Sequence, residues 1–208
     1  MKKPLLYLVR HGATVDSAKN IFRGQHDAAL NKKGFSDAHI LKEFFKTVEW
    51  HRIFCSPLTR AIQTATIICD DQSDYQPETT PGLESWDIGA MTGAVKTPKN
   101  KEKMEYFITN PDKAPEGGES RHEFEHRVWP LIAAGIELGW KQGTPCIEVV
   151  HSSLIHALNH LMQGEKHEDI AVKPGGVVEI FMEDGEIFHQ PIFKVAKEDG
   201  SLDPKNAS

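Results

Sequence analysis

The sequence predicts an α/β fold, a three-layer α/β/α sandwich with a mostly parallel central sheet. Two observations lead to this prediction. Short apolar runs, typical of buried strands, alternate along the chain with longer stretches that have the apolar spacing of helices. In addition, two of the expected helices begin directly after an expected strand, as they do where helices connect parallel strands.

The expected elements follow from this alternation. Apolar runs predict strands over residues 5–9, 52–55, 147–150, 177–181 and 186–189. Helical spacing predicts helices over residues 35–48, 58–69, 119–141 and 153–162. Ser56 and Pro57 are expected to supply the N-cap and first residue of the second helix, and Ser152 and Ser153 are expected to cap the fourth.

The length of 208 residues fits one domain, which we expect to span residues 1–195, followed by a polar C-terminal tail over residues 196–208. Residues 94–118 differ from their surroundings, because they combine several lysines with prolines and the pair Gly117-Gly118. Such a segment is typical of an excursion from the sheet. We therefore expect an inserted lid.

Composition limits the partners of the chain. A net charge of −6 with 26% charged residues is ordinary for a globular protein and gives no indication of nucleic-acid binding. Cys55, Cys69 and Cys146 are widely spaced in apolar sequence and are expected to be reduced core residues. Arg10 and His11 end the first apolar run too early for an export signal or a membrane span. We expect a cytoplasmic protein with no membrane partner.

Charged side chains follow three of the expected strands. Arg10 and His11 follow the first, Arg60 lies just after the second, and His151 follows the third. Because the carboxyl ends of parallel strands meet at one edge of a sheet, we expect these four side chains to converge there. Two guanidinium groups, two imidazoles and two helix N-termini form a site for an anion such as phosphate.

The same surroundings predict how the site would react. Neighbouring positive charge lowers the pKa of a histidine, so one imidazole can stay neutral and nucleophilic near pH 7. The arginines can meanwhile neutralise the oxygens of a phosphoryl group. This chemistry requires no metal and no other cofactor.

Six motifs occur in order along the chain: LVRHGAT from residue 8, RGQHDAALNKKG from 23, CSPLTRAIQTA from 55, GLESWDIGAMTG from 82, PEGGES from 115 and VVHSS from 149. Together they resemble the histidine phosphatase superfamily, in its phosphoglycerate mutase-like branch. The resemblance implies a phosphoglycerate mutase-like fold, with His11 as the nucleophile that becomes phosphorylated. It implies that Arg10, Arg60 and His151 bind the phosphoryl group, and that His151 also takes part in catalysis.

The resemblance also implies an acid that protonates the leaving alcohol. The family usually places a glutamate four residues before the glycine that matches Gly89, where this chain has Ser85. Glu84 and Asp87 are the two carboxyl groups left for the role, and Glu84 is slightly favoured. A second departure is Ser17, which stands where many members have an asparagine that touches substrate.

The predicted function is hydrolysis of a phosphomonoester, a phosphorylated small molecule, through a phosphohistidine. Within the family the alternative is a phosphoglycerate mutase-type phosphotransferase. Resembling mutases shield the phosphohistidine with a longer lid and an extended C-terminal tail, and residues 94–118 look short for that.

Two alternatives from other classes stay open. Ser85 at the usual acid position would suit a non-catalytic phosphate-binding module. The pairs His122 with His126 and His156 with His160 have the i, i+4 spacing of metal ligands on one helix face, which would suit a metal-dependent hydrolase. Exposed sheet edges could pair two copies of the chain into a homodimer, but no residue of the sequence indicates the oligomeric state.

Overall fold

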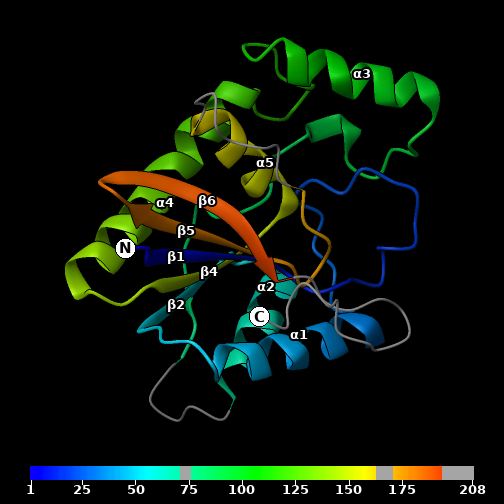
Figure 1. Cartoon of the computed structure of the whole chain (residues 1–208). Coiled ribbons are helices and arrows are strands. Elements are labelled where there is room, and N and C mark those ends of the chain that lie inside the picture. The colour runs from blue at the N-terminus through cyan, green and yellow to red at the C-terminus, as the bar shows by residue number, and fades with distance from the viewer. Residues whose placement is uncertain (71–75, 163–170, 194–208) are drawn as a thin grey trace.

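The computed structural model describes residues 1–70, 76–162 and 171–193. The expected polar tail, residues 196–208, lies outside the described residues. In what is described, one sheet carries helices on both faces (Figure 1), so the predicted three-layer α/β/α fold is confirmed.

The described residues form six strands in the order β3-β2-β4-β1-β5-β6. Their bounds are β1 Lys3–Arg10, β2 Arg52–Cys55, β3 Glu78–Thr79, β4 Cys146–Val150, β5 Val177–Glu183 and β6 Glu186–Phe193. Strands β3, β2, β4 and β1 run parallel to one another, whereas β5 is antiparallel to both β1 and β6. The sheet is therefore mostly parallel, with an antiparallel pair at one edge.

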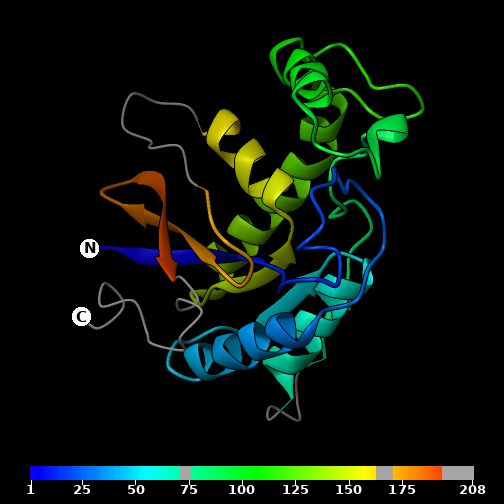
Figure 2. The ribbon, with the colours of Figure 1, turned by 90° about the vertical axis from the view of Figure 1, so that its right-hand side faces the viewer.

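Helices cover both faces of the sheet (Figures 1 and 2). Helices α1 (Lys32–Phe45) and α2 (Thr59–Cys69) pack on one face, where Leu41 and Ile68 belong to the core. Helices α4 (Arg121–Gln142) and α5 (Ser152–Leu161) pack on the other with residues such as Ile132. Each helix buries an apolar face, which is why its sequence shows helical spacing.

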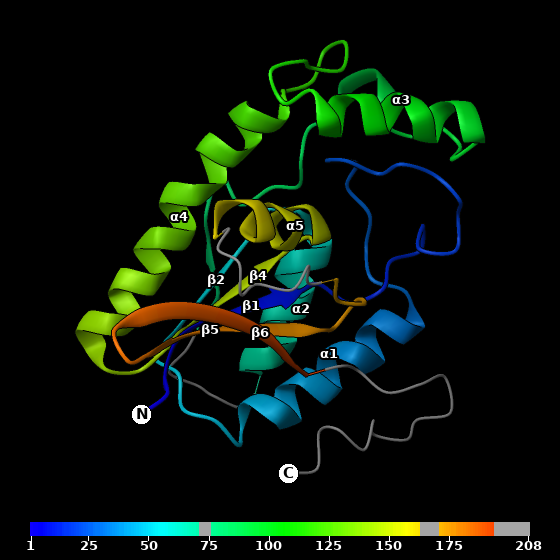
Figure 3. The same cartoon turned by 45° about the horizontal axis from the view of Figure 1, so that its top comes forward.

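A further helix, α3 (Pro98–Thr109), lies in the inserted segment and was not predicted. It stands away from the sheet, beside the loop that follows β1 (Figure 3). Thr97 caps it through the backbone N–H of Asn100, at 3.2 Å. Only Met104 and Phe107 are buried along it, so its apolar face is too narrow for a clear helical pattern. A 3-10 turn, Gly89–Met91, packs beneath it.

The expected cap of α2 is wrong. The helix begins at Thr59 rather than at Pro57, and Ser56 does not cap it. The Ser56 hydroxyl instead lies 2.8 Å from Nε2 of His151. A residue distant in sequence, Asp27, accepts a 2.8 Å hydrogen bond from the backbone N–H of Thr59. The capping group of α2 therefore comes from another loop, which local sequence cannot indicate.

The expected cap of α5 is wrong for a similar reason. The N-cap residue is His151, and the helix begins at Ser152. The hydroxyl of Ser153 accepts a 3.2 Å hydrogen bond from the backbone N–H of Trp86, in a loop contact rather than a helix cap. The serines that follow β2 and β4 thus bind groups of other loops at this edge of the sheet.

The three cysteines are free and buried, as expected. In the part of the chain that the structure describes, no helix combines the length and apolar character needed to cross a membrane.

Replacing a buried carboxyl group on β4 is expected to stabilise the protein by an amount that depends on pH. Glu148 is 3% exposed, burial raises its pKa to about 8, and its Oε2 has no hydrogen-bond partner among the described residues. Because the pKa of Glu148 is higher in the folded than in the unfolded chain, the group lowers the free energy of unfolding only above the unfolded pKa. The protein is fully stable with respect to this group below the unfolded pKa and loses stability as the pH rises to about 8. We expect Glu148→Gln to raise the free energy of unfolding at that pH by on the order of 2–4 kcal/mol.

Urea unfolding of wild type and Glu148→Gln, at about pH 5 and about pH 8, checks this. The gain should be much smaller at the lower pH, where the wild-type carboxyl group is neutral in the folded state. An equal gain at both values would contradict the assignment.

Candidate active site

Three side chains from different loops meet at the carboxyl edge of the parallel strands. His11 follows β1, Arg60 lies in the first turn of α2, and His151 joins β4 to α5. The two imidazole centroids are 5.1 Å apart. The Nε–H of Arg60 lies 3.2 Å from Nε2 of His11 and 3.3 Å from Nδ1 of His151. The expected convergence of these three residues is therefore observed.

The hydrogen bonds of His11 decide which ring nitrogen is free to react. Its Nδ1 is 2.7 Å from the carbonyl oxygen of Gly12. A carbonyl oxygen only accepts, so Nδ1 carries the proton and Nε2 keeps its lone pair. That lone pair faces Arg60, and the ring is 4% exposed. His11 thus presents Nε2 as a nucleophile.

The glycine after His11 allows two backbone segments to touch. A Cβ on Gly12 would lie 2.6 Å from the carbonyl oxygen of Gly34, in the first turn of α1. The backbone N–H of Gly12 also donates to the hydroxyl of Thr64 on α2, at 3.1 Å. The loop that carries His11 is therefore fixed against both helices of this face, as expected for a glycine that permits close approach.

The second imidazole has a fixed tautomer as well. Because Nδ1 of His151 accepts from Arg60, its Nε2 carries the proton and donates to Ser56 at 2.8 Å. Burial is the main cause that lowers the pKa of both histidines well below 6.5, and the positive charge of Arg60 lowers both further. Both rings are neutral near pH 7.

This pair predicts acid sensitivity. The unfolded chain protonates His11 and His151 near pH 6.5, whereas the folded chain does so only at much lower pH. Their contribution to stability is present above pH 6.5 and is lost as the pH falls from 6.5 towards the lower folded pKa values. We expect a loss of up to roughly 1 kcal/mol per pH unit for each ring.

Urea unfolding between about pH 7.5 and about pH 5 measures this slope. His151→Gln should reduce it, and His39→Gln, at an exposed position on α1, should not. Equal slopes for His151→Gln and wild type would contradict the assignment.

Positive charge surrounds a small cavity next to His11. Its volume is about 120 Å³, several times the volume of a water molecule and enough for one phosphoryl group. It is lined by His11, Ile21, Arg23, Gly24, Arg60, Ser85, Lys96, His151 and Ser152. No carboxyl group is among these described residues. The cavity therefore combines cationic donors with no nearby anion on its wall, which suits a bound phosphate.

Arg60 is held in place by neutral groups. It is 3% exposed and donates to the carbonyl oxygens of His26 at 2.7 Å and Gly24 at 3.3 Å. Burial is the main cause that lowers its pKa, to about 10, so it stays charged at neutral pH. A desolvated cation of this kind interacts strongly with an arriving anion.

The structure does not place Arg10 on the wall of this cavity. Its NH1 group donates to the carbonyl oxygen of Val172 at 2.6 Å. Its Nε is buried and has no hydrogen-bond partner among the described residues. The charge of Arg10 still contributes to the low pKa of His11. Its predicted contact with a phosphoryl group stays a prediction.

Two cations on the cavity wall were not predicted as site residues. Arg23 comes from the irregular loop after β1, where its NH1 group donates to the hydroxyls of Thr14 and Ser17, each at 3.2 Å. Lys96 comes from the inserted segment. Ser17, the second departure from the family pattern, thus helps to hold Arg23 at the site.

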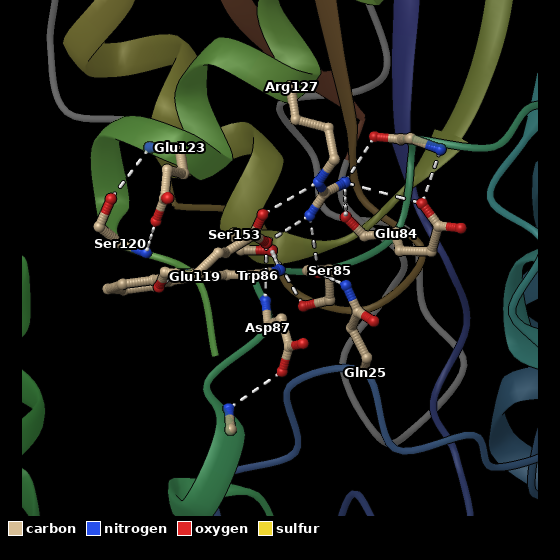
Figure 4. Close-up of polar contacts among 12 residues, drawn as sticks. Gln25, Glu84, Ser85, Trp86, Asp87, Glu119, Ser120, Glu123, Arg127 and Ser153 are labelled. Carbon is tan, nitrogen blue, oxygen red and sulfur yellow. Dashed lines mark hydrogen bonds and ion pairs between the residues drawn. The ribbon is translucent and has the colours of Figure 1, made fainter. Parts of the chain in front are cut away.

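Neither candidate acid reaches the cavity wall. Oε2 of Glu84 accepts a 2.7 Å hydrogen bond from the backbone N–H of Gly82. Oδ1 of Asp87 accepts from the backbone N–H of Gly89 at 3.0 Å. Figure 4 shows both carboxyl groups in this loop, with Ser85 between them in the chain. Of these residues, only Ser85 lines the cavity.

Arg127 of α4 fixes the loop that carries these residues. Its NH1 group donates to the carbonyl oxygens of Gly82 at 2.7 Å and Glu84 at 3.2 Å, and its NH2 group donates to that of Ser85 at 3.3 Å (Figure 4). It also pairs with Glu119. Three hydrogen bonds from one guanidinium group to the backbone of this loop fix its position beside the cavity.

One histidine of each pair lies against a single carboxyl group. Nδ1 of His122 lies 2.7 Å from a carboxyl oxygen of Asp112, and Nδ1 of His160 lies 3.2 Å from one of Glu125. Among residues 1–70, 76–162 and 171–193, no three potential metal-binding side chains are grouped together.

Comparisons with known proteins identify the family to which the sequence is similar. The sequence model of the histidine phosphatase superfamily (branch 1) matches residues 6–189. The chain is 29% identical over 173 residues to a 2,3-bisphosphoglycerate-dependent phosphoglycerate mutase of Mesorhizobium japonicum, covering 79% of this chain and 84% of the relative.

Solved structures show the same architecture. A phosphoglycerate mutase from Thermus thermophilus superposes with a TM-score of 0.65 at 26% identity, covering 86% of this chain and 92% of that one. A mycobacterial glucosyl-3-phosphoglycerate phosphatase superposes with a TM-score of 0.73 at 22% identity, covering 89% of this chain and 96% of that one. The second match is a likeness of fold alone.

Proposed function

Because this chain belongs to the histidine phosphatase superfamily (branch 1), we propose that it hydrolyses a phosphomonoester through a phosphohistidine at His11. One observation carries the proposal. A neutral imidazole presents the Nε2 lone pair beside a phosphate-sized cavity whose lining residues include Arg23, Arg60 and Lys96. This arrangement provides a nucleophile and a stabilised position for the negative charge of the phosphoryl group.

The first transfer forms a bond between Nε2 of His11 and phosphorus and breaks the ester P–O bond. The Nε–H of Arg60, which donates to Nε2 in the free protein, then binds a phosphoryl oxygen instead. His151 flanks the same oxygens, with its ring held by Ser56. The leaving alkoxide takes up a proton as the bond breaks.

The second transfer releases the phosphate. A water molecule attacks phosphorus, the bond to Nε2 breaks, and the water loses a proton to the group that served as acid. Arg60 and the other cations again stabilise the in-line transition state. Splitting the reaction into two transfers lowers each barrier.

Glu84 and Asp87 remain our candidates for the acid. In the free protein each carboxyl group binds a backbone N–H, of Gly82 and Gly89 respectively. Catalytic contacts are often long before substrate binds, so the proposal requires one of these carboxyl groups to exchange its backbone partner for the substrate.

The inserted segment, residues 94–118, favours hydrolysis over transfer of the phosphoryl group to a second substrate. From residues 94–118, only Lys96 lines the phosphate-sized cavity. A mutase must keep water from its phosphohistidine, whereas a hydrolase must admit water. A mutase is still the second candidate, because curated relatives at 27–30% identity are named phosphoglycerate mutases.

An assay of products separates these candidates. Phosphate release is measured from an activated aryl phosphate, sugar phosphates and glycerate phosphates, with and without chelator, next to interconversion of phosphoglycerates. We expect release that resists chelator. Interconversion of phosphoglycerates faster than phosphate release would establish a mutase. Phosphate binding without either reaction would establish a binding module. Loss of phosphate release in the presence of chelator would establish a metal-dependent hydrolase.

We also propose a cytoplasmic location and a phosphorylated small molecule as the substrate. The three buried free thiols support a reducing compartment. Cell fractionation tests the location. A homodimer stays a prediction, and sedimentation of the purified chain tests it.

A further inference from the structure

A second, larger cavity adjoins the phosphate-sized one. Its volume is about 480 Å³, within the range of small-molecule pockets. Its lining residues come from the loop after β1, the Gly82–Asp87 loop, α3, α4 and α5: Phe22, Trp86, Met104, Ile108, Arg121, Phe124, Glu125, Ser152, Ser153, His156, Ala157 and His160. We call it the apolar pocket.

The two cavities are continuous in their walls. Ser152 lines both of them. The hydroxyls of Ser85, on the phosphate side, and Ser153, in the apolar pocket, are 3.0 Å apart (Figure 4). Lys96 of the phosphate side stands 5.2 Å from the ring centroid of Phe22. A phosphoryl group bound beside His11 therefore places the rest of its molecule next to the apolar pocket.

Carbon atoms dominate the surface of the apolar pocket. Phe22 and Trp86 supply aromatic faces, and α3 adds Met104 and Ile108. The indole N–H of Trp86 is already bound to the carbonyl oxygen of Glu119 at 2.9 Å. The pocket thus offers a ligand mainly apolar and aromatic contact.

Several polar groups of its lining bind one another. NH1 of Arg121 lies 3.1 Å from Oε1 of Glu125, and Nδ1 of His160 lies 3.2 Å from the same oxygen. A ligand hydroxyl or carboxylate buried here would compete with these contacts, whereas an apolar ring would not.

We propose that the apolar pocket binds the leaving group of the substrate, and that this leaving group is an aromatic alcohol rather than a glycerate or a sugar. The proposal rests on the proposed function. A phenol is a stronger acid than a sugar hydroxyl and needs less protonation to leave. A phenolic leaving group therefore also suits a reaction cavity lined by Ser85 without a carboxyl group.

Binding of phosphonates tests the pocket independently of turnover, because their C–P bond replaces the ester bond. Benzylphosphonate carries the ring, and 3,4-dihydroxybutylphosphonate carries a glycerol-like chain of hydroxyls. We expect calorimetry to show that wild type binds benzylphosphonate ~10-fold or more tightly than the dihydroxy compound, because the ring is buried.

Two matched variants of α3 locate the effect. Ile108 lines the pocket and is 37% exposed, and Tyr106 does not line it and is 49% exposed. Ile108→Glu should lower the preference for benzylphosphonate ~5-fold or more, and Tyr106→Glu should leave it unchanged. Both should bind inorganic phosphate like wild type. Ala157→Leu, which fills the pocket without adding charge, should also lower the preference.

Each outcome decides the proposal. No preference in wild type, or equal losses in Ile108→Glu and Tyr106→Glu, would overturn it. Hydrolysis of phenyl phosphate is measured separately: a protein that prefers benzylphosphonate but never releases phosphate would refute the proposed function and leave the pocket assignment standing. Turnover of phenyl phosphate without a preference for benzylphosphonate would refute the pocket assignment and leave the proposed function standing.

Discussion

His11→Ala is expected to abolish phosphate release, with kcat at least ~10³-fold lower than in wild type. The variant lacks Nε2 of His11, the nucleophile that bonds to phosphorus in the first transfer of our mechanism. Arg60 and the other cations remain, so binding of inorganic phosphate should persist. Steady-state release from an aryl phosphate and calorimetry with phosphate measure the two effects separately.

His39→Ala is the matched control, because this histidine is exposed on α1 and does not line the cavity. It should keep wild-type kcat. If His11→Ala folds, binds phosphate and retains a substantial share of kcat, the phosphohistidine route is wrong. If it loses phosphate binding and folding together, His11→Gln, which preserves most of the side-chain volume, repeats the comparison.

Arg60→Lys is expected to lower kcat/KM by ~10² to 10³-fold. The guanidinium group spans both imidazoles, and it also donates to the carbonyl oxygen of His26. An ammonium group keeps the charge but cannot reproduce this planar set of donors. The phosphoryl group would lose an aligned donor, chiefly in the transition state.

Arg52→Lys is the control for this substitution, since Arg52 is an exposed residue at the start of β2 that pairs with Glu78. Kinetics with an aryl phosphate, together with urea unfolding, separate loss of function from loss of fold. Wild-type kcat/KM in a folded Arg60→Lys protein would show that the guanidinium group has no special role at the site.

Most of the fold could be predicted because its signals are local. Strand β2 was predicted with its observed bounds, and the other expected strands and helices were found with shifted ends. Helix α3 was missed because it buries only Met104 and Phe107, and the two-residue strand β3 because it is too short to show a pattern. The caps were wrong because groups distant in sequence bind the serines concerned: His151 binds Ser56, and the backbone N–H of Trp86 binds Ser153.

Some residues of the candidate site could likewise be predicted from the sequence, and others could not. His11, Arg60 and His151 stand at strand or helix ends, so the topology of a parallel sheet brings them together from sequence alone. Arg23 lies in a loop without regular structure, and its only signal was its place in the RGQHDAALNKKG motif. The orientations of Glu84 and Asp87 depend on backbone N–H groups and on Arg127, which no spacing rule describes.

The apolar pocket was not foreseen for a related reason. It combines Phe22, Trp86, Ile108 and Phe124, which come from four separate segments. Each of these residues alone is an ordinary apolar position. Only their assembly beside the phosphate-sized cavity gives them a proposed role in substrate choice.

The central claim is tested most directly by trapping the phosphorylated protein. Excess protein is mixed rapidly with an aryl phosphate and quenched in alkaline denaturant, which preserves phosphohistidine, and the phosphoryl group is then located by mass spectrometry of peptides. The account predicts one phosphoryl group on His11, formed and lost fast enough to support turnover, and none on His151. Turnover without labelled His11, or a phosphoryl group on another residue, would contradict it.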